Sequence, residues 1–233
     1  YEYPLEELMT TALSSEKLSI KTKLFYGIGD VGNALVNSAV QFFLLIYFTD
    51  GALLPPALVG SALLIGKIWD AINDPLFGWF SDRFSSKRFG KRRFFMIFGA
   101  IPLAISIMLL WFVPRGLERV GVFIWIAFTF ILFDTIWTLT NVPYYSLSSE
   151  LTEDYDERSS LTSFRMILAV PAYIVGAALT PAIVGLFASK YTGYGFIGIL
   201  YGVIAASALL ISASGLKEKP DISIYRHDKF VDL

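Results

Sequence analysis

The sequence predicts an all-α integral membrane protein, a bundle of six transmembrane helices. Of its 233 residues, 55% are hydrophobic and 17% are charged, and the mean hydropathy is +0.59, whereas a typical soluble domain is about 25% charged. The charges gather in short segments, and the apolar stretches between them reach the roughly 20 residues that a helix needs to cross a bilayer. Isolated strands would leave backbone groups unpaired in lipid, so we expect each stretch to be a helix.

Six apolar stretches are long enough to be these spans. They leave a cytoplasmic N-terminal segment at 1–23 and, at 215–233, a cytoplasmic tail or the start of a linker to further spans. Within the bundle, 24–214, the first three and the last three spans follow a similar order, so we expect two three-helix repeats at about 24–113 and 120–214. The predicted spans are Leu24–Phe48, Pro56–Phe80, Phe94–Val113, Val120–Leu147, Ser163–Phe187 and Gly195–Ser214.

Basic residues are divided unevenly between the connections, and cytoplasmic loops carry the excess of Lys and Arg. The N-terminal segment, the loops after spans two and four, and the tail together hold fourteen, whereas the opposite connections hold three, Arg115, Arg119 and Lys190. We therefore expect a multi-pass protein of the cell membrane with both termini cytoplasmic, which six spans satisfy.

Composition and motifs exclude several classes of function. The net charge of −1 indicates no nucleic-acid partner, cysteine is absent, and the single histidine, His227, lies in the tail, so Cys and His metal sites are excluded. No nucleophile–base arrangement is present. The glycines at 27–32 open a helix without a preceding strand, so they do not form a phosphate-binding loop. We expect neither an enzyme nor an ATP-driven pump, and no cofactor.

A polar stripe runs along the first span. Asp30, Asn33 and Asn37 follow one another at steps of three and four, so they share one helix face. Hydrogen bonds between helices are one explanation for the two asparagines, whereas the carboxylate needs a partner. All three are candidates for binding a polar solute.

The second span carries charge on one face. Lys67, Asp70 and Asp74 are spaced by three and four, and each unpaired charge in a span costs about 2.5–3.5 kcal/mol even on the lenient insertion scale. One interpretation is a salt bridge that only fixes helix packing. The other is a sodium or proton site, because two carboxylates one turn apart repel unless a proton or cation lies between them. We assign Asp70, Asn73 and Asp74 to the cation and Lys67 to the solute, and expect no other metal.

The fourth span has a stripe that combines hydroxyl, amide and aromatic groups. Such a wall suits a sugar, since it offers hydrogen bonds to hydroxyls and a flat apolar face to the ring. For Tyr145 the alternative is an aromatic belt at the membrane surface. Arg165, at the predicted start of span five, can pair with a carboxylate across the bundle. The stripe contains Asp134, Trp137, Thr138, Asn141 and Tyr145; the solute candidates are Trp137, Asn141, Tyr145 and Arg165.

Two charged connections lie on the predicted cytoplasmic side. The loop after span two, Arg83–Arg93, is basic, and the loop after span four, Glu150–Glu157, is acidic. Either these charges only set topology, or they form a gate in which several pairs act together, because one exposed pair contributes only about 0–1 kcal/mol. The gate candidates are Asp82, Arg83, Arg88, Glu150, Glu157 and Arg158.

These motifs together resemble the glycoside–pentoside–hexuronide:cation symporters, a family of the major facilitator superfamily that includes the melibiose carrier. The resemblance extends from about Lys23 to Leu216. Its most specific part is the second-span motif in combination with the Glu-Arg loop. It rests on Tyr26-Gly27-Ile28-Gly29-Asp30, Trp69-Asp70-Ala71-Ile72-Asn73-Asp74-Pro75, Gly78, Pro143-Tyr144-Tyr145-Ser146-Leu147, Glu150-Leu151-Thr152, Asp154, Glu157-Arg158, Leu161 and Arg165.

The resemblance implies the N-terminal half of a twelve-helix fold, with a second six-helix half supplied beyond residue 233 or by another chain. It places the coupling cation beside Asp70 and Asp74, with the hydroxyl of Thr138. It places a sugar at the membrane midplane against spans one, four and five.

The solute side of the resemblance is incomplete. Asn141 stands where the melibiose carrier has a carboxylate, Ala34 where it has another, and Tyr145 where it has its ring-stacking tryptophan, whereas Arg165 is kept. We therefore expect the cation machinery to be retained and the solute to differ from melibiose.

The expected function is secondary active transport, in which sodium or a proton drives the symport of a sugar-like or glycoside-like solute by alternating access. The expected partners are the lipid bilayer, the solute and the second half. The alternative is a non-transporting membrane scaffold or assembly factor with a carrier-like fold.

Overall fold

The computed structural model describes residues 17–84, 86 and 89–218, so Arg88, His227 and the outer parts of both terminal segments lie outside the described residues. Regular structure in the described part is helical, apart from one isolated bridge between Ser86 and Gly90. The elements are α2 (Ile20–Ile46), the π-helical turn η1 (Tyr47–Gly51), α3 (Pro56–Arg83), α4 (Arg93–Leu110), α5 (Arg119–Leu151), α6 (Tyr155–Val184) and α7 (Lys190–Gly215).

The six predicted spans are confirmed as six helices. Among the described residues, five of them are long and apolar enough to cross a membrane: α2 with η1, α4, α5, α6 and α7. The remaining helix, α3, has 28 residues and so reaches about 42 Å, which is ample. It is less apolar because it carries Lys67, Asp70, Asn73 and Asp74.

The start of the fifth span was predicted wrongly. We expected it at Ser163, but α6 begins at Tyr155, where the Asp154 side chain caps the helix by accepting the backbone N–H of Glu157. Carboxylates in a first turn are favourable because the N-terminus of a helix carries partial positive charge. Most of the predicted acidic loop is therefore helical, and Arg165 lies three turns into α6 rather than at its start.

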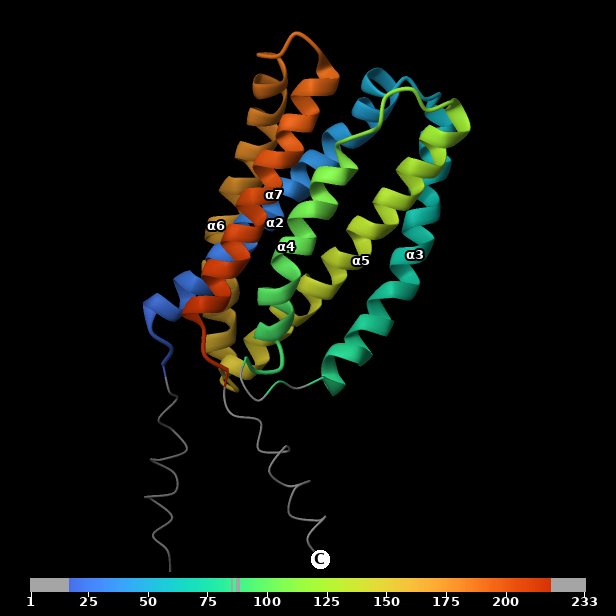
Figure 1. The fold of residues 1–233 in the computed structure, drawn as a ribbon. Helices are drawn as coiled ribbons and strands as arrows, with labels where there is room; N and C mark the ends of the chain where they lie inside the picture. The colour runs from blue at the N-terminus through green and yellow to red at the C-terminus, as the bar shows by residue number, and fades with distance from the viewer. Residues whose placement is uncertain (1–16, 85, 87–88, 219–233) are drawn as a thin grey trace, which may run out of the picture.

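Helix α2 lies against α6 and α7, α4 lies between α7 and α5, and α3 packs on α5 (Figure 1). If α2, α3 and α4 are matched in order with α5, α6 and α7, the contact of α2 with α6 corresponds to that of α5 with α3, and the contact of α2 with α7 corresponds to that of α5 with α4. The division into two three-helix units nevertheless stays a prediction. For the site, the important result is that α5 contacts α3 along one side while its later turns approach α2.

Small residues allow the closest of these approaches. A Cβ built at Gly29 would lie 2.7 Å from the Tyr144 ring and 2.9 Å from the Ser212 hydroxyl, and one at Gly32 would overlap the backbone of Ala205. These two glycines therefore allow α5 and α7 to approach α2 closely.

Large apolar side chains cover the outward faces of the bundle. A water-soluble monomer rarely exposes so much contiguous apolar surface, which agrees with a multi-pass membrane protein. The start of α2 and the end of α7 lie at the same end of the bundle (Figure 1); which side of the membrane that end faces stays a prediction. Exposed examples are Ile68, Trp79, Ile124, Phe128, Ile167 and Ile174.

Candidate functional site

Helix α5 carries polar side chains toward two neighbours. One group of polar residues lies between α5 and α3, and we call it the carboxylate cluster: Lys67, Asp70, Asn73, Asp74, Asp134 and Thr138. The other group lies between α5, α2 and α6 and borders a pocket.

The carboxylate cluster joins α3 to α5 by side-chain hydrogen bonds. The Thr138 hydroxyl donates to Asp74 Oδ1 at 2.9 Å. One turn earlier, the Asn73 amide donates to Asp134, at 3.3 Å from both Oδ2 and the backbone oxygen. Because the partners are four residues apart on α5 and adjacent on α3, the contacts form successive rungs along the packed helices. The structure thus brings Asp74, Asn73 and Thr138 together, three of the residues assigned to the cation.

Lys67 and Asp70 form an ion pair at 3.1 Å, with side chains 64% and 32% exposed. Asp74 is exposed as well. Within the described chain this charged face is not buried, because α3 packs mainly on α5. The salt bridge of the first interpretation therefore exists, while Asp74, beside Thr138, retains oxygen that can meet a hard cation.

The second polar group borders a pocket of about 220 Å³ between α2, α5 and α6. Five of the lining residues are those expected from the polar stripes, Asp30, Asn33, Asn37, Trp137 and Tyr145. From α6 the prediction named only Arg165 and missed the residues that line the pocket. Their signal was present, since Arg165, Ala169 and Tyr173 are spaced by four and share a face. The remaining lining residues are Ala34, Met166, Ala169, Val170 and Tyr173.

Asp30 is the polar centre of this pocket. Its carboxylate lies 3.6 Å from Arg165 Nε and accepts hydrogen bonds from the Tyr145 hydroxyl at 3.1 Å and the Asn33 amide at 3.5 Å. The Arg165 guanidinium lies over the Tyr145 ring, 4.8 Å from its centroid. The pairing of Arg165 with a carboxylate across the bundle is therefore confirmed.

Three of the solute candidates do not line this pocket: Asn141, Lys67 and Arg165, which reaches it only through its pair with Asp30. Asn141 is buried behind Asn33, whose amide donates to it. Lys67 lies on α3, which packs mainly on α5, so the structure does not bring it to this pocket, and its assignment to the solute stays a prediction. Asn37 borders the pocket and accepts from Gln41 at 2.9 Å.

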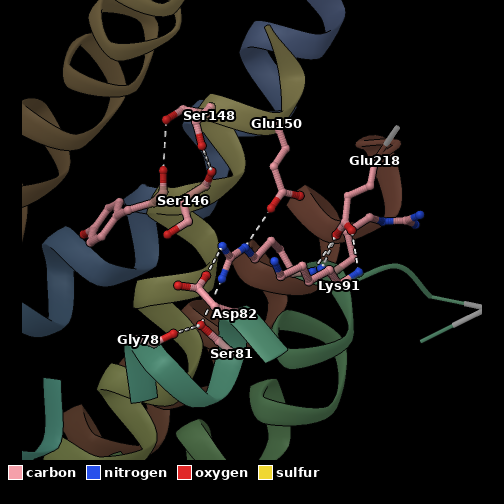
Figure 2. A network of polar contacts seen from close by, with 12 residues as sticks. Gly78, Ser81, Asp82, Lys91, Ser146, Ser148, Glu150 and Glu218 are labelled. Carbon is pink, nitrogen blue, oxygen red and sulfur yellow. Dashed lines mark hydrogen bonds and ion pairs between the residues drawn. The ribbon is translucent and has the colours of Figure 1, made fainter. Parts of the chain in front are cut away.

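A third cluster, which we call the Arg92 network, lies at the end of the bundle where α3 ends and α4 begins. Figure 2 shows Ser81 and Asp82 from α3, Glu150 from α5 and Glu218 from beyond α7 gathered there. The Arg92 guanidinium donates to Asp82 at 2.5 Å, to Glu150 at 2.8 Å and to Ser81 at 2.9 Å. Its side chain is only 9% exposed, so one buried cation joins three helices.

Glu218 caps the start of α4. Its carboxylate accepts the backbone N–H groups of Lys91 at 2.6 Å and Arg92 at 2.9 Å, and that of Arg93. Burial raises the pKa of the Glu218 carboxyl above its ordinary value, although these N–H groups oppose the shift. The segment after α7 is thereby attached to the start of α4.

The other gate candidates have different partners. Arg83 stacks on Trp79, 3.8 Å from the ring centroid. Glu157 pairs with Lys23 at 2.8 Å, and Arg158 donates to a backbone oxygen at Thr152. Among the described residues these three do not contact Arg92, and their assignment to a gate stays a prediction. Glu157 meets α2 because α6 begins earlier than expected. Arg92 was missed as the centre, since sequence alone does not distinguish it from its basic neighbours.

Sequence comparison gives matches along nearly the whole chain. Residues 25–230 match the profile of the family described as MFS/sugar transport protein. An uncharacterized symporter of Synechocystis sp. is 41% identical over 217 residues, which is 91% of this chain and 40% of that protein. The inner membrane symporter YicJ of Escherichia coli is 34% identical over 186 residues, 80% of this chain and 40% of that protein.

A vertebrate protein matches at a similar level. The sodium-dependent lysophosphatidylcholine symporter 1 of Mus musculus is 35% identical over 173 residues, 73% of this chain and 32% of that protein. The chain therefore spans about two fifths or less of the length of these curated relatives.

Proposed function

Since the chain belongs to the MFS/sugar transport protein family of the major facilitator superfamily, we propose that it forms the N-terminal half of a cation-coupled symporter. The two halves of such a carrier rock around a site near the membrane midplane and expose it to each side in turn. In this proposal the carboxylate cluster binds the coupling cation, sodium or a proton, and the pocket around Asp30 binds the solute.

One observation carries this proposal: α5 belongs to both polar groups. Thr138 contacts Asp74 on α3, and seven residues later Tyr145 contacts Asp30 on α2. Seven residues of helix are about 10 Å long. Both sites lie on one continuous helix, so movement of α5 reaches both. Two ligands are coupled when each binds better to a conformation that the other favours.

Uptake by the full-length protein in proteoliposomes tests the proposal. We expect an inward sodium or proton gradient to drive accumulation of the solute, and loss of the gradient to stop it. Uptake that depends on neither the sodium gradient nor the proton gradient would exclude coupling. Absence of any uptake by folded protein would instead favour the non-transporting scaffold.

The pocket favours a solute with a polar part and an apolar part. Asp30, Arg165 and Asn33 offer charge and hydrogen bonds on one side, whereas Met166 and Val170 form an apolar wall on α6. A glycoside with an apolar aglycone and a lysophospholipid both have this character, and one relative is named for lysophosphatidylcholine. Competition between a labelled glycoside and lysophosphatidylcholine for uptake distinguishes the two solute classes.

Replacing Tyr145 by Ala is expected to weaken solute binding far more than cation binding. The change removes a ring beneath Arg165 and a hydrogen bond to Asp30, but no group of the carboxylate cluster. Aromatic stacking and one charge-assisted hydrogen bond together contribute about 2–3 kcal/mol, so we expect solute affinity to fall about 30–100-fold. Separate titrations with solute and with sodium measure the two effects. An equal loss of both would mean that Tyr145 is structural.

We also propose that the Arg92 network is a cytoplasmic gate that favours the outward-facing state. Neutralising Asp82 and Glu150 together, by Asp82→Asn and Glu150→Gln, removes both carboxylate partners of Arg92. Partly exposed pairs contribute about 0–1 kcal/mol each, so the inward-facing population should rise about tenfold.

Spin-label distances between Ser149 and the same end of the second half measure this shift. The matched control, Glu153→Gln with Asp156→Asn, neutralises two exposed carboxylates near the same end and should leave the distances unchanged. If the Asp82→Asn, Glu150→Gln variant has the wild-type distances, the charges of Asp82 and Glu150 only set the topology of the chain in the membrane.

A further inference from the structure

We propose that Asp134 is a positioning residue of the cation site: it orients the Asn73 amide so that the amide oxygen becomes a ligand of the coupling cation. This inference rests on the proposed function. Asp134 was seen as part of the fourth-span stripe but assigned no role. The structure places its carboxylate inside the carboxylate cluster, one turn before Thr138 on α5.

The orientation of the Asn73 amide follows from the chemistry of its partner. The amide nitrogen lies 3.3 Å from the backbone oxygen of Asp134 and 3.3 Å from its Oδ2. A backbone oxygen only accepts hydrogen bonds, so the NH₂ group must face Asp134. An inverted amide would place its oxygen against two other oxygens. Asp134 therefore turns the oxygen of Asn73 away from itself.

That oxygen is buried without a partner. Asn73 is 0% exposed, and its Oδ1 makes no hydrogen bond in the described part of the chain. A buried polar atom in this condition needs a water or an ion to satisfy it. An amide oxygen is a suitable ligand for a hard cation such as sodium, which prefers oxygen donors.

Asn73 lies between the two carboxylates along α3. It follows Asp70 by three residues, so these two share a helix face, and it directly precedes Asp74, which lies about 100° further around the helix. The amide nitrogen and oxygen share one carbon, which keeps the oxygen close to the Asp134 contact, and Asp134 lies one turn of α5 before Thr138, which donates to Asp74. A cation here would meet carboxylate, amide and hydroxyl oxygens from two helices.

Two substitutions separate orientation from charge. Asp134→Asn retains a side-chain oxygen that can accept from Asn73, whereas Asp134→Leu removes it and leaves only the backbone acceptor. Loss of a residue that orients a ligand typically lowers ion affinity about 10–100-fold. Because the backbone contact persists, we expect Asp134→Leu to raise the half-saturating sodium concentration about tenfold, the lower end of that range. Asp134→Asn keeps an acceptor for the Asn73 amide but removes a charge, so it should lose less sodium affinity than Asp134→Leu.

The matched control is Thr135→Val. It removes the hydrogen bond from Trp69 Nε1 to the Thr135 hydroxyl, 2.8 Å, which also joins α3 to α5, without touching Asn73. It should loosen the helix pair but leave sodium affinity unchanged.

The experiment measures sodium binding to the purified full-length protein by calorimetry, with solute uptake at saturating sodium alongside. Asp134→Leu should lose sodium affinity but keep uptake at saturating sodium. Equal losses of sodium affinity in Asp134→Leu and Asp134→Asn would overturn the positioning role, and so would unchanged sodium affinity in both variants. If wild type binds no sodium, the cation arm of the proposed function fails and this inference falls with it, whereas wild-type binding with an unaffected Asp134→Leu overturns this inference alone.

Discussion

Replacing Asp74 by Asn is expected to abolish the stimulation of uptake by the coupling cation. Asp74 accepts from Thr138, and in the described chain no Lys or Arg forms an ion pair with its carboxylate. A unit charge pair at about 4 Å and an effective dielectric of about 20 contributes about 4 kcal/mol before desolvation. Losing even two thirds of that lowers cation affinity about 100-fold.

The same change at Asp70 should have a smaller effect. Asp70 is already paired with Lys67 at 3.1 Å, so part of its charge is neutralised before a cation binds. We expect Asp70→Asn to lower cation affinity by about tenfold. In wild type the cation must compete with Lys67 for Asp70, so the attraction that the variant loses is smaller than at Asp74. This order, Asp74 before Asp70, is specific to the geometry of the cluster.

Uptake measured against sodium concentration and against pH tests both variants. Asp50→Asn is the control: Asp50 is a carboxylate paired with Lys190 at 3.0 Å, it is 48% exposed, and it lies in η1, away from both polar groups. It should leave the cation dependence unchanged. Wild-type cation dependence in both Asp70→Asn and Asp74→Asn would place the cation site elsewhere, with Asp30 as the next candidate.

The second large effect is expected at Asp30. Replacing Asp30 by Leu leaves the Arg165 guanidinium, 18% exposed, without its carboxylate. Removing one member of a largely buried ion pair typically costs about 3–5 kcal/mol, because the remaining charge stays desolvated. We therefore expect a clear drop in the thermal unfolding midpoint and loss of solute binding.

Removing both charges should separate stability from binding. The double variant Asp30→Leu with Arg165→Leu leaves no unpaired charge, so its unfolding midpoint should recover toward that of wild type while solute binding stays lost. Thermal unfolding in detergent and solute titration measure the two properties. A double variant less stable than Asp30→Leu alone would show that Arg165 stabilises the bundle through contacts other than this pair.

Much of the fold follows from local pattern. The six apolar stretches place the helices, because an apolar stretch of about 20 residues crosses a bilayer as a helix, which satisfies its own backbone hydrogen bonds. The steps of three and four among Asp30, Asn33 and Asn37 likewise place them on one face, and the pocket contains all three. The helix start at Tyr155 was missed because a cap such as Asp154 outweighs the polarity of the residues that follow.

The candidate site depended more on packing. The α6 wall of the pocket, the central place of Arg92 and the contact between Asn73 and Asp134 all join residues that are far apart in sequence. Periodicity states which residues share a face of one helix, but not which face of another helix they meet. Arg92 is one of several neighbouring cations, and only the positions of Asp82 and Glu150 select it.

From the sequence alone came the membrane location, the number of helices and the polar stripe on each, since these depend on hydrophobicity and on the 3.6-residue period of a helix. Only the tertiary structure decided that α5 contributes to two polar groups, one shared with α3 and the other with α2 and α6. It also decided that Asp134 holds Asn73 while Thr138 holds Asp74. The reason is physical: a side chain four residues further along a helix keeps its face, but its partner depends on how closely and at what angle the helices pack.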